Sequence, residues 1–384
     1  FEALGKNHVS IAAIAQGASE RNISFVVATA DRVRALRAVH EAFFEPRRKL
    51  MLAVVGVGNI GGALLRLLER QRAYLLGRGF DVRVGAVSNS RGCVLDPNGI
   101  DLGRWRETLA ASRRRLSPKG LARAVAACEW THAALVDCTA SPDVVEAYPD
   151  FVRANLHIVT PNKKANVLPM KRYRALMGLL GERHKHFLYE ANVGAGLPII
   201  STLLDLVASG DTVVRIEGIF SGTLGYLFNG PAGEPFSARV KSAHALGFTE
   251  PDPREDLSGR DVARKLLVLA RLTGLDLELG DIAVEDLVPR PLRSGAAKQS
   301  FCADLARWDA TMAARQAAAR RRGKALRYAG VLRDGRASAG LREYPVDHPL
   351  AMGRRNDNII AFTTRRYAKT PLVVQGPGAG ADVT

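Results

Sequence analysis

The chain has 384 residues and a formal net charge of +17, with 47% hydrophobic and 6% aromatic residues. This length is enough for two or three domains, and the hydrophobic share is ordinary for a globular core. The arginines are dispersed or stand in short clusters without interleaved aromatic residues, which argues against nucleic-acid binding as the main function. A solvated basic surface explains the charge, and an anionic cofactor would add a reason for it.

The cysteines are scattered along the chain and form no CxxC pair. This spacing argues against a zinc ribbon or a disulfide framework and predicts a reducing, cytoplasmic location. No apolar stretch is long enough to span a bilayer, so we expect no membrane insertion. Because the chain opens on Phe1 rather than Met, we also expect it to be part of a longer protein.

Residues 1–45 are expected to form a small unit of their own. Residues 9–15 are predicted to be helical, residues 23–28 to form a strand, and residues 32–44 to form a second helix. The inward-facing residues of this second helix are expected to be Val33, Leu36, Ala38 and Val39. Two helices and one strand cannot bury a hydrophobic core by themselves. We therefore expect this unit to belong to a larger domain.

A buried strand, a glycine turn and a helix follow one another from residue 50. Residues 50–55 are continuously apolar, as in a parallel sheet, and run directly into a G-x-G-x-x-G turn and a helix. This order is the fingerprint of a dinucleotide site, in which the pyrophosphate lies on the helix N-terminus. A glycine turn that only packs is the alternative. The predicted cofactor residues here are Gly56, Gly58, Asn59, Ile60 and Gly61.

The next strand, residues 82–87, ends in a turn without an acidic residue. An NAD-selective site usually has Asp or Glu there, to bind the ribose 2′-hydroxyl. Ser90 and Arg91 could instead accept a 2′-phosphate, so we predict that NADP(H) binds at least as well as NAD(H). Arg91 as an ordinary solvated loop residue fits the sequence equally well.

Two further buried strands, residues 133–138 and 156–160, end at candidate binding residues. Thr139 follows the first strand, and Lys163 lies just beyond the second. Ligands of open parallel sheets bind at the carboxyl ends of the strands, so both residues are expected to lie in the cofactor cleft.

A glycine-rich turn, residues 190–198, precedes an apolar helix, residues 199–206. Its backbone carbonyls and the Glu190 carboxylate are oxygen ligands that suit a hard cation. An ordinary transition from loop to helix, with Pro198 near the helix start, is the alternative.

The stretch 249–265 is acidic in a chain that is otherwise basic. Pro251 and Pro253 are expected to hold its first part extended, because each proline disfavours helix in the residue before it. Ser258 is predicted to be a helix N-cap, with Asp261 at the third helical position of a capping box.

A buried helix is predicted to run from residue 262 to residue 272. Asp261 and Lys265 are four residues apart, so they project from the same face of this helix. They could form a surface ion pair of roughly 0.2–0.5 kcal/mol. Alternatively, the carboxylate orients a lysine that acts as a general acid.

The C-terminal third is predicted to begin with a polar helical region, residues 283–325, and to continue as strands. The strands are expected at residues 326–332, 337–341, 358–364 and 371–375. A second glycine turn at residues 376–381 could face the cofactor.

These motifs together resemble those of a homoserine dehydrogenase, over about residues 48–384. The matching segments are residues 56–61, 160–165, 190–198, 249–265 and 375–380. Residues 1–45 resemble the end of the ACT regulatory region in bifunctional aspartokinase–homoserine dehydrogenases. This second resemblance implies an aspartate kinase N-terminal to the present chain, and an ACT remnant too short to bind a regulatory amino acid alone.

The resemblance implies NAD(P)-dependent interconversion of L-homoserine and L-aspartate 4-semialdehyde, on the route to threonine, methionine and isoleucine. It implies that Lys265 gives the proton to the aldehyde oxygen. It also implies catalytic roles for Asp261 and for Lys163, which it assigns to the cofactor and substrate cleft. The residues implied for binding and orienting the substrate are Glu250, Asp256 and Asp261. Those implied for further cofactor contacts are Gly247 and Gly380. A structural sodium ion is implied at Glu190, with the carbonyls of Val193, Ala195 and Leu197.

Elementary chemistry agrees with these roles. The aldehyde oxygen gains negative charge as hydride arrives, so a nearby ammonium stabilises it and then supplies a proton. The substrate amino group is cationic and favours carboxylates, which explains an acidic stretch in a basic chain.

The predicted fold is α/β, with a Rossmann-type domain at residues 46–190 and an α+β catalytic and dimerisation domain at residues 191–350. Residues 351–384 are expected to return to the nucleotide-binding domain. A homodimer is expected, and a tetramer is left open for a full-length bifunctional protein. The alternatives are an NADP-dependent oxidoreductase acting on another amino-acid aldehyde and a non-catalytic module that senses NADP.

Overall fold

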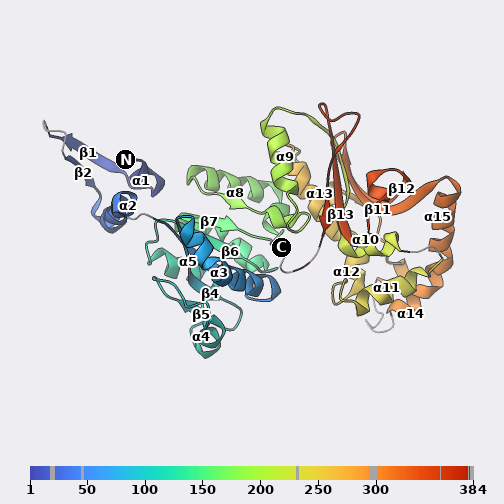
Figure 1. The fold of residues 1–384 in the computed structure, drawn as a ribbon, viewed down its shortest axis with the longest axis horizontal. Coiled ribbons are helices and arrows are strands. Elements are labelled where there is room, and N and C mark those ends of the chain that lie inside the picture. The colour runs from blue at the N-terminus through green and yellow to red at the C-terminus, as the bar shows by residue number, and fades with distance from the viewer. Residues whose placement is uncertain are drawn as a thin grey trace. The chain divides into compact units, whose positions relative to one another are not determined.

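The computed structural model describes residues 1–17, 22–44, 47–230, 233–293, 301–354, 356–378 and 380. The chain forms two compact units (Figure 1). The first comprises residues 1–165 and 171–189, and the second residues 166–170 and 190–384. Among the helices of the described residues, none is both long and apolar enough to cross a membrane.

The first unit begins with a helix, a hairpin and a second helix. Its elements are α1 (Glu2–Lys6), β1 (Ile11–Gln16), β2 (Ile23–Val27), the 3-10 turn η1 (Thr29–Asp31) and α2 (Arg32–Phe44). The prediction of a strand near residue 23 and of a helix over residues 32–44 is confirmed. The prediction of a helix over residues 9–15 is wrong, because β1 pairs antiparallel with β2 and the pairing outweighs local helical spacing.

The inward face of α2 also differs from the prediction. Val33 and Leu36 are 39% and 66% exposed, whereas Ala35 and Ala38 are each only 3% exposed. The two alanines pack with Leu4 and Val9. Val39 packs against the same cluster, so the prediction is confirmed for Ala38 and Val39 and is wrong for Val33 and Leu36.

The rest of the first unit is a six-stranded sheet with helices. The strands are β3 (Arg48–Val55), β4 (Phe80–Ser88), β5 (Cys93–Leu95), β6 (Ala133–Asp137), β7 (Leu156–Val159) and β8 (Phe187–Leu188). The helices are α3 (Asn59–Gly77), α4 (Trp105–Ala111), α5 (Pro118–Ala126), α6 (Pro142–Glu146), α7 (Tyr148–Arg153) and α8 (Met170–Glu182), with the 3-10 turn η2 (Ala165–Val167) before α8.

The strand order is β5-β4-β3-β6-β7-β8, and all pairings are parallel except that of β5 with β4. The order reverses between β3 and β6, since β4 lies on one side of β3 and β6 on the other. In sheets of this kind a ligand crevice lies at the carboxyl ends of the strands beside such a reversal. The predicted Rossmann-type fold is confirmed.

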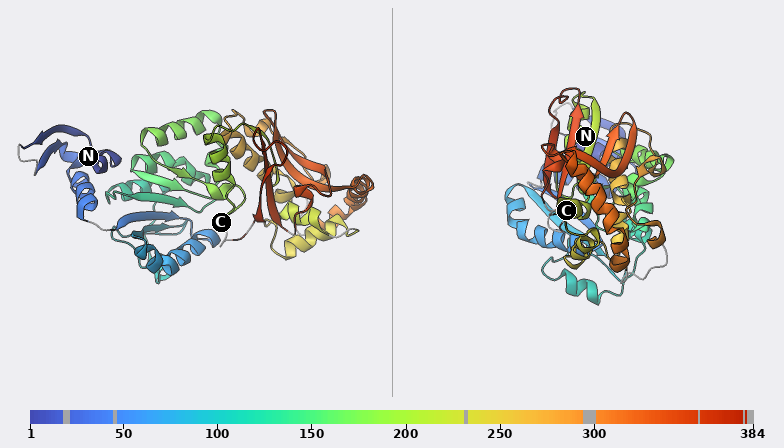
Figure 2. Two further views of the ribbon diagram at one scale, coloured as in Figure 1. Left: turned by 45° about the horizontal axis from the view of Figure 1, so that its top comes forward. Right: turned by 90° about the vertical axis from the view of Figure 1, so that its right-hand side faces the viewer.

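The second unit is built on a mostly antiparallel sheet with the order β10-β12-β11-β9-β13-β14. Its strands are β9 (Val213–Ile219), β10 (Ala283–Val284), β11 (Lys324–Arg333), β12 (Arg336–Pro345), β13 (Asp357–Thr364) and β14 (Leu372–Pro377). Figure 2 shows the orange and red strands of this sheet beside the yellow helices.

The helices of the second unit are α9 (Ile199–Ala208), α10 (Gly222–Asn229), α11 (Phe236–Ala245), α12 (Pro253–Leu257), α13 (Arg260–Leu272), α14 (Phe301–Leu305) and α15 (Asp309–Arg321). The 3-10 turns are η3 (Glu190–Asn192), η4 (Leu279–Asp281), η5 (Arg290–Leu292), η6 (Ala306–Trp308) and η7 (Pro349–Ala351). Helix α13 packs on β11 and β12, and α10 packs on β11 and β13.

The prediction that residues 351–384 return to the nucleotide-binding unit is wrong for the strands in this range. Strand β13 pairs with β9 on one side and with β14 on the other, inside the second sheet. Its centre is apolar and buried, with Ile359 and Phe362 both 0% exposed. The region 283–325, expected to be helical, contains η5, α14, η6 and α15 but also β10 and the start of β11, and its residues 294–300 lie outside the described residues. Residues 379 and 381 of the last glycine turn, and residues 382–384 after it, lie outside the described residues.

Candidate active site

The glycine turn after β3 is shaped by close backbone contacts. Gly56 has a φ of +86°, and a Cβ there would lie 2.6 Å from Thr139 Cγ2. A Cβ on Gly61 would lie 2.0 Å from the carbonyl oxygen of Gly56. The first position therefore needs the left-handed backbone freedom of glycine, and the second needs its lack of a side chain.

Gly58 differs from these two glycines, because a Cβ there would meet no atom of the described residues within 4 Å. It is the N-cap residue of α3, a helix of 19 residues whose first two residues are Asn59 and Ile60. Glycine cannot cap a helix with a side chain, so the first N–H groups of α3 can be bound by an anionic ligand. Open space above an uncapped helix N-terminus fits the pyrophosphate of a dinucleotide.

The turn after β4 presents Ser90 and Arg91 to solvent. The Asn89 side-chain oxygen accepts hydrogen bonds from the backbone N–H groups of Arg91 and Gly92, each at 2.8 Å. Arg115 Nε donates to the Arg91 carbonyl at 3.1 Å, so a second guanidinium lies beside the turn. Such a turn is chemically suited to a phosphate group and has no carboxylate for a 2′-hydroxyl.

Asp137, the last residue of β6, organises the loops at the carboxyl ends of β6 and β7. It is 0% exposed. Its Oδ1 accepts from the N–H and the hydroxyl of Thr139 at 2.8 and 2.6 Å. Its Oδ2 accepts from the Tyr148 hydroxyl at 2.7 Å and from Asn162 Nδ2 at 3.0 Å. Burial raises the pKa of Tyr148 well above its usual value, so this hydroxyl remains a donor.

This carboxylate holds the two loops that carry the predicted residues Thr139 and Lys163. Lys163 is half-buried, and the N–H of Lys164 is fixed by the Asn162 side chain at 3.1 Å. Sequence reasoning missed Asp137. The available signal was an acidic residue closing an otherwise apolar buried strand, since a buried carboxylate needs several donors around it.

In the second unit, Lys265 is held from two sides. Its Nζ lies 2.7 Å from Asp261 Oδ2 and donates to the carbonyl of Phe220 at 2.6 Å. The lysine side chain is 12% exposed, whereas that of Asp261 is 40% exposed. A solvated surface pair would not bury its lysine or bind it to a carbonyl 45 residues away. The geometry favours an oriented ammonium over a surface ion pair.

Asp256 ties the acidic stretch to α10. Its Oδ2 accepts from the N–H of Glu250 at 2.8 Å, and its Oδ1 lies 2.9 Å from the Thr223 hydroxyl. Burial raises the pKa of the Asp256 carboxyl, and these two hydrogen bonds oppose the rise. The Thr223 hydroxyl also reaches the Phe248 carbonyl at 2.6 Å. Glu250 itself is exposed, so its carboxylate is accessible to a ligand.

Two predictions about the local structure of this stretch are wrong. The N-cap of α13 is Gly259 rather than Ser258, so Asp261 is its second helical residue and not the third. Ser258 instead closes α12 and donates its hydroxyl to the Glu255 carbonyl at 2.6 Å. The expected extended run also stops early, because α12 begins at Pro253. Proline suits this first helical position because its fixed φ is already helical.

Gly259 is required by its surroundings. Its φ is +67°, and a Cβ there would lie 1.9 Å from the Tyr328 hydroxyl oxygen. Tyr328 is 2% exposed and donates to the Glu285 carbonyl at 2.7 Å. The left-handed glycine lets the chain turn from α12 into α13 directly against this ring, which places Asp261 and Lys265 beside the end of β9.

The Glu190 carboxylate binds the start of α9. Its two oxygens accept the N–H groups of Ile200 and Ser201 at 2.7 and 2.9 Å. In the loop between them, Gly194 and Ala195 both have left-handed backbones, with φ values of 81° and 54°. Each carboxylate oxygen keeps a further lone pair, so the same residue can cap the helix and bind a cation. No cluster of three His, Cys, Asp or Glu residues suited to a metal occurs among the described residues.

The last two predicted cofactor residues, Gly247 and Gly380, both lie in the second unit. Gly247 has a φ of +71° in the turn after α11, two residues before the acidic stretch begins. Gly380 has a φ of +134°, and both of its chain neighbours lie outside the described residues.

Family models match almost the whole chain. The model described as homoserine dehydrogenase matches residues 198–384, and its NAD-binding domain matches residues 56–190. An ACT domain model matches residues 1–43. The predicted resemblance to both families is confirmed.

Two relatives illustrate the similarity at the sequence level. A bifunctional aspartokinase/homoserine dehydrogenase of Arabidopsis thaliana is 45% identical over 100% of this chain and 43% of its own length. A homoserine dehydrogenase of Schizosaccharomyces pombe is 39% identical over 88% of this chain and 93% of its own length. The chain therefore spans less than half of the bifunctional relative and nearly all of the monofunctional one.

Solved structures agree. A Candida auris protein, described as of unknown function, has a TM-score of 0.82 at 35% identity, covering 88% of this chain and 95% of its own. A mutant hyperthermophilic archaeal homoserine dehydrogenase in complex with NADPH has a TM-score of 0.67 at 21% identity, covering 88% and 94%. The second likeness shows the fold alone. The glycine turn and the oriented lysine agree with these matches. The family models and the identity and coverage of these relatives show that the chain belongs to the homoserine dehydrogenase family.

Proposed function

We propose that the chain catalyses the NAD(P)-dependent interconversion of L-aspartate 4-semialdehyde and L-homoserine. The observation that carries this proposal is the half-enclosed Lys265 ammonium, held by Asp261 at 2.7 Å and by the Phe220 carbonyl at 2.6 Å. Both contacts fix the direction of the ammonium, which is what a proton donor to a single carbonyl oxygen requires.

The bound nicotinamide cofactor would supply or accept the hydride. As the aldehyde carbon is reduced, its oxygen develops negative charge, and the Lys265 ammonium stabilises that charge and gives up a proton. Asp261 keeps the lysine side chain in place through both steps. In the oxidative direction the neutral lysine accepts the hydroxyl proton instead. Lys163, on the loop organised by Asp137, would add positive charge on the cofactor side of the reaction.

The substrate carries a cationic amino group and a carboxylate. We propose that Glu250, Asp256 and Asp261 bind and orient the amino group. Glu250 is the exposed member of this set, and its backbone N–H is fixed by Asp256 at 2.8 Å. Carboxylates placed in this way favour an amino-acid aldehyde over a simple aldehyde, which lacks the cation.

The direct test is an absorbance assay of NADPH with the semialdehyde, and of NADP⁺ with L-homoserine. Two competing substrates should be included, glutamate 5-semialdehyde and an unsubstituted aldehyde of equal length. We expect kcat/KM for the aspartate semialdehyde to exceed that for either competitor by at least about tenfold, because a displaced or missing amino group loses its charge-assisted hydrogen bonds to the carboxylates. Equal or greater activity on a competitor would favour another oxidoreductase. Binding of NADPH without any turnover would favour the sensing module.

We propose NADP(H) as the preferred cofactor, because the turn after β4 has Ser90, Arg91 and the neighbouring Arg115 but no acid. The archaeal relative of similar fold was solved with NADPH. Replacing Arg91 with alanine should raise the KM for NADPH about tenfold and leave that for NADH nearly unchanged, since a charge-assisted bond to phosphate is lost. An unchanged ratio of the two KM values would contradict the assignment.

We further propose a structural sodium ion at Glu190, with the carbonyls of Val193, Ala195 and Leu197. The left-handed Ala195 supports this, since a non-glycine residue is held in that conformation only by strong surrounding contacts. Unfolding temperatures in sodium, potassium and tetramethylammonium chloride at equal ionic strength test it. Sodium should raise the wild-type value, and Glu190→Gln should abolish the difference between salts. The difference is the readout, because Glu190→Gln also weakens the start of α9.

Three wider proposals follow from the family. A kinase part would precede this chain in a full-length protein, as in the bifunctional relatives. The homodimer expected from the sequence is supported by exposed apolar residues on α9, where Leu204 and Val207 are 43% and 39% exposed, and light scattering tests it. The cytoplasmic location stays a prediction.

A further inference from the structure

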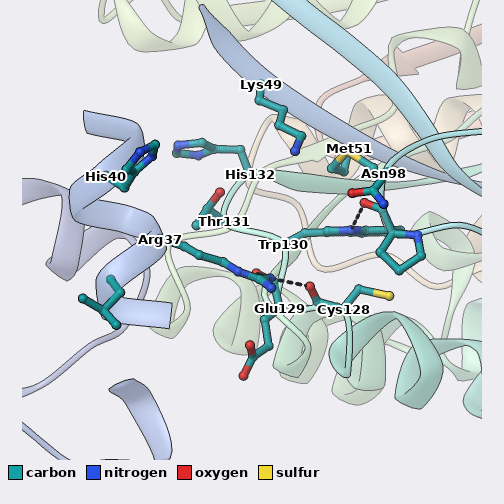
Figure 3. Close-up of a pocket in the computed structure, with 12 residues that line it drawn as sticks. Arg37, His40, Lys49, Met51, Asn98, Cys128, Glu129, Trp130, Thr131 and His132 are labelled. Carbon is teal, nitrogen blue, oxygen red and sulfur yellow. Dashed lines mark hydrogen bonds between the residues drawn. The ribbon is translucent and has the colours of Figure 1, made fainter. Parts of the chain in front are cut away.

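A cavity of about 470 Å³ in the first unit shows how polar side chains of this protein are normally satisfied (Figure 3). Arg37 Nη1 donates to the backbone carbonyls of Cys128 and Glu129 at 2.8 and 3.2 Å. The indole N–H of Trp130 donates to the Pro97 carbonyl at 3.2 Å. Folded proteins leave few buried polar groups unpaired, because each one loses its hydrogen bonds to water. A buried polar side chain without a partner is therefore an exception that needs a reason.

Asn358, the second residue of β13, is such an exception in the second unit. It is 0% exposed, and neither its Oδ1 nor its Nδ2 has a hydrogen-bond partner. Among the described residues, no other side chain leaves two buried polar atoms unpaired. A leucine of similar size would fill the same place without losing hydrogen bonds to water. The unpaired amide therefore lowers the stability of the folded chain.

Asn358 lies beside the strand end that holds the proposed proton donor. Strands β13 and β9 are antiparallel, and Ile359 pairs with Ile219, the last residue of β9. The residue after Ile219 is Phe220, whose carbonyl accepts from Lys265 Nζ at 2.6 Å. The same register brings Asn358 next to Phe220, because residues of antiparallel strands pair in reverse order. The unpaired amide thus belongs to the surroundings of the lysine site.

On its other side, the amide packs against the last glycine turn. Asn358 pairs with Gly376 of β14, and a Cβ on Gly378 would lie 2.3 Å from Asn358 Cγ and 2.4 Å from its Nδ2. A Cβ on Gly376 would lie 2.8 Å from Leu197 Cδ2. Neither glycine has a left-handed backbone, so both are needed for room rather than for backbone freedom. The backbone at Gly378 therefore lies directly against the unpaired amide.

We propose that Asn358 is a positioning residue for the cofactor, whose amide forms hydrogen bonds with the backbone of the last glycine turn when this turn contacts the nucleotide. The inference rests on the proposed function, because Gly380 of this turn is one of the predicted cofactor residues. Backbone N–H and carbonyl groups are the partners that an amide with a free acceptor and free donors requires. Forming these bonds satisfies the amide and fixes the turn, so it favours cofactor binding.

The test compares Asn358→Leu with the wild-type chain by NADPH titration, the semialdehyde assay and urea unfolding. Leucine keeps the volume and removes the amide. We expect the Kd and the KM for NADPH to rise about tenfold, because buried hydrogen bonds are lost, and the KM for the semialdehyde to change by less than about twofold. The free energy of unfolding should stay the same or rise, since no unpaired amide is buried.

Gln316→Leu is the matched control, because Gln316 is a half-buried amide on α15. Its Kd for NADPH should equal that of the wild-type chain. A purely structural role of Asn358 gives a different result. Lower stability of Asn358→Leu with unchanged NADPH affinity would overturn the proposal, and so would unchanged Kd, KM and stability.

A second variant serves if Asn358→Leu fails to fold by circular dichroism. Asn358→Ala combined with Gly378→Ala lets the added methyl group at position 378 occupy the room left by the amide. This double variant should fold and should also bind NADPH about tenfold more weakly. Wild-type affinity in the double variant would overturn the proposal. If the wild-type chain binds NADPH without turnover, the proposed function is wrong, and the comparison of Kd values still decides the role of Asn358.

Discussion

The nucleotide turn of the first unit and the lysine site of the second are built in opposite ways. The turn depends on side chains that are missing, since a Cβ on Gly61 would lie 2.0 Å from a backbone oxygen. The lysine site depends on charged side chains that three helices and a strand end bring together. A contiguous motif is therefore enough to recognise the first, whereas the second exists only once distant segments have folded.

The largest effect is expected at the lysine site. Replacing Lys265 with methionine keeps the length of the side chain and removes the proton donor. We expect kcat to fall about a thousandfold, as is usual for loss of a positioned general acid. Binding of NADPH, followed by its fluorescence, should be retained, because the nucleotide turn lies in the other unit.

Arg264→Met is the matched control, since Arg264 is the exposed neighbour of Lys265 on the same helix. Its kcat should stay within about twofold of wild type, because a surface substitution away from the site changes little. A Lys265→Met protein with near wild-type turnover would contradict the assignment of the proton donor.

The nucleotide turn should respond differently at two of its own glycines. Gly61→Ala places a methyl group against the Gly56 carbonyl, and we expect it to lower the free energy of unfolding by about 3 kcal/mol. Gly58→Ala meets open space, so the protein should fold normally. It should nevertheless lose affinity for NADPH, because the methyl group would occupy the room needed by the pyrophosphate.

Urea unfolding and NADPH titration of both variants measure these two effects. Normal NADPH affinity in Gly58→Ala would mean that the open space is not the pyrophosphate site. Normal stability in Gly61→Ala would mean that the close approach of α3 to β3 can relax.

The lysine site also depends on a glycine, Gly259, although this residue is not part of a glycine motif in the sequence. Gly259→Ala forces a methyl group toward the Tyr328 hydroxyl and imposes a left-handed backbone on a non-glycine residue. We expect a loss of about 2 kcal/mol in the free energy of unfolding. Adding Tyr328→Phe removes the hydroxyl, so the double variant should lose less than the sum of the two single variants. Additive losses, measured by urea unfolding, would show that the backbone strain acts alone.

The same contrast explains what could be predicted from the sequence. The strand before Gly56, the glycine turn and α3 follow one another in the chain, and hydrophobic pattern and turn chemistry agree there. Ser258 fitted a capping box by spacing, but the ring of Tyr328 selects Gly259 as the N-cap. The Phe220 carbonyl and Asp137 act on residues 45 and 25 positions away, so no local pattern could reveal them. The prediction that the last strands return to the first unit was wrong for the same reason, because β13 pairs with β9, which is far away in the sequence.

The smallest expected effect concerns pH and distinguishes the two units. His157 lies on β7, and its pKa is lowered from 6.5 to about 4. Burial is the main cause, and the nearby Lys185 and His186 add to it. Its Nδ1 also accepts the His186 N–H at 2.9 Å, which a protonated ring cannot do. The folded state therefore favours neutral His157. Its contribution to stability is fully present above pH 6.5 and is lost as pH falls toward 4.

The contribution of Asp256, in the second unit, to stability depends on pH with the opposite sign. Burial raises its pKa above 3.8, so its contribution is present below that pH and declines as pH rises. Replacing His157 with glutamine, which can still accept the His186 N–H, should flatten the pH dependence of unfolding between pH 6.5 and 4 by about 1 kcal/mol. This is less than the roughly 3 kcal/mol that the full pKa shift would give, because solvent screens the partly exposed ring. Asp256→Asn should leave the pH dependence near pH 6.5 unchanged and alter it only at the acidic end, above pH 3.8. Urea unfolding at closely spaced pH values measures both. An unaltered slope in His157→Gln would mean that the imidazole is solvated in solution, and the stability of the nucleotide-binding sheet would then be set by its apolar core alone.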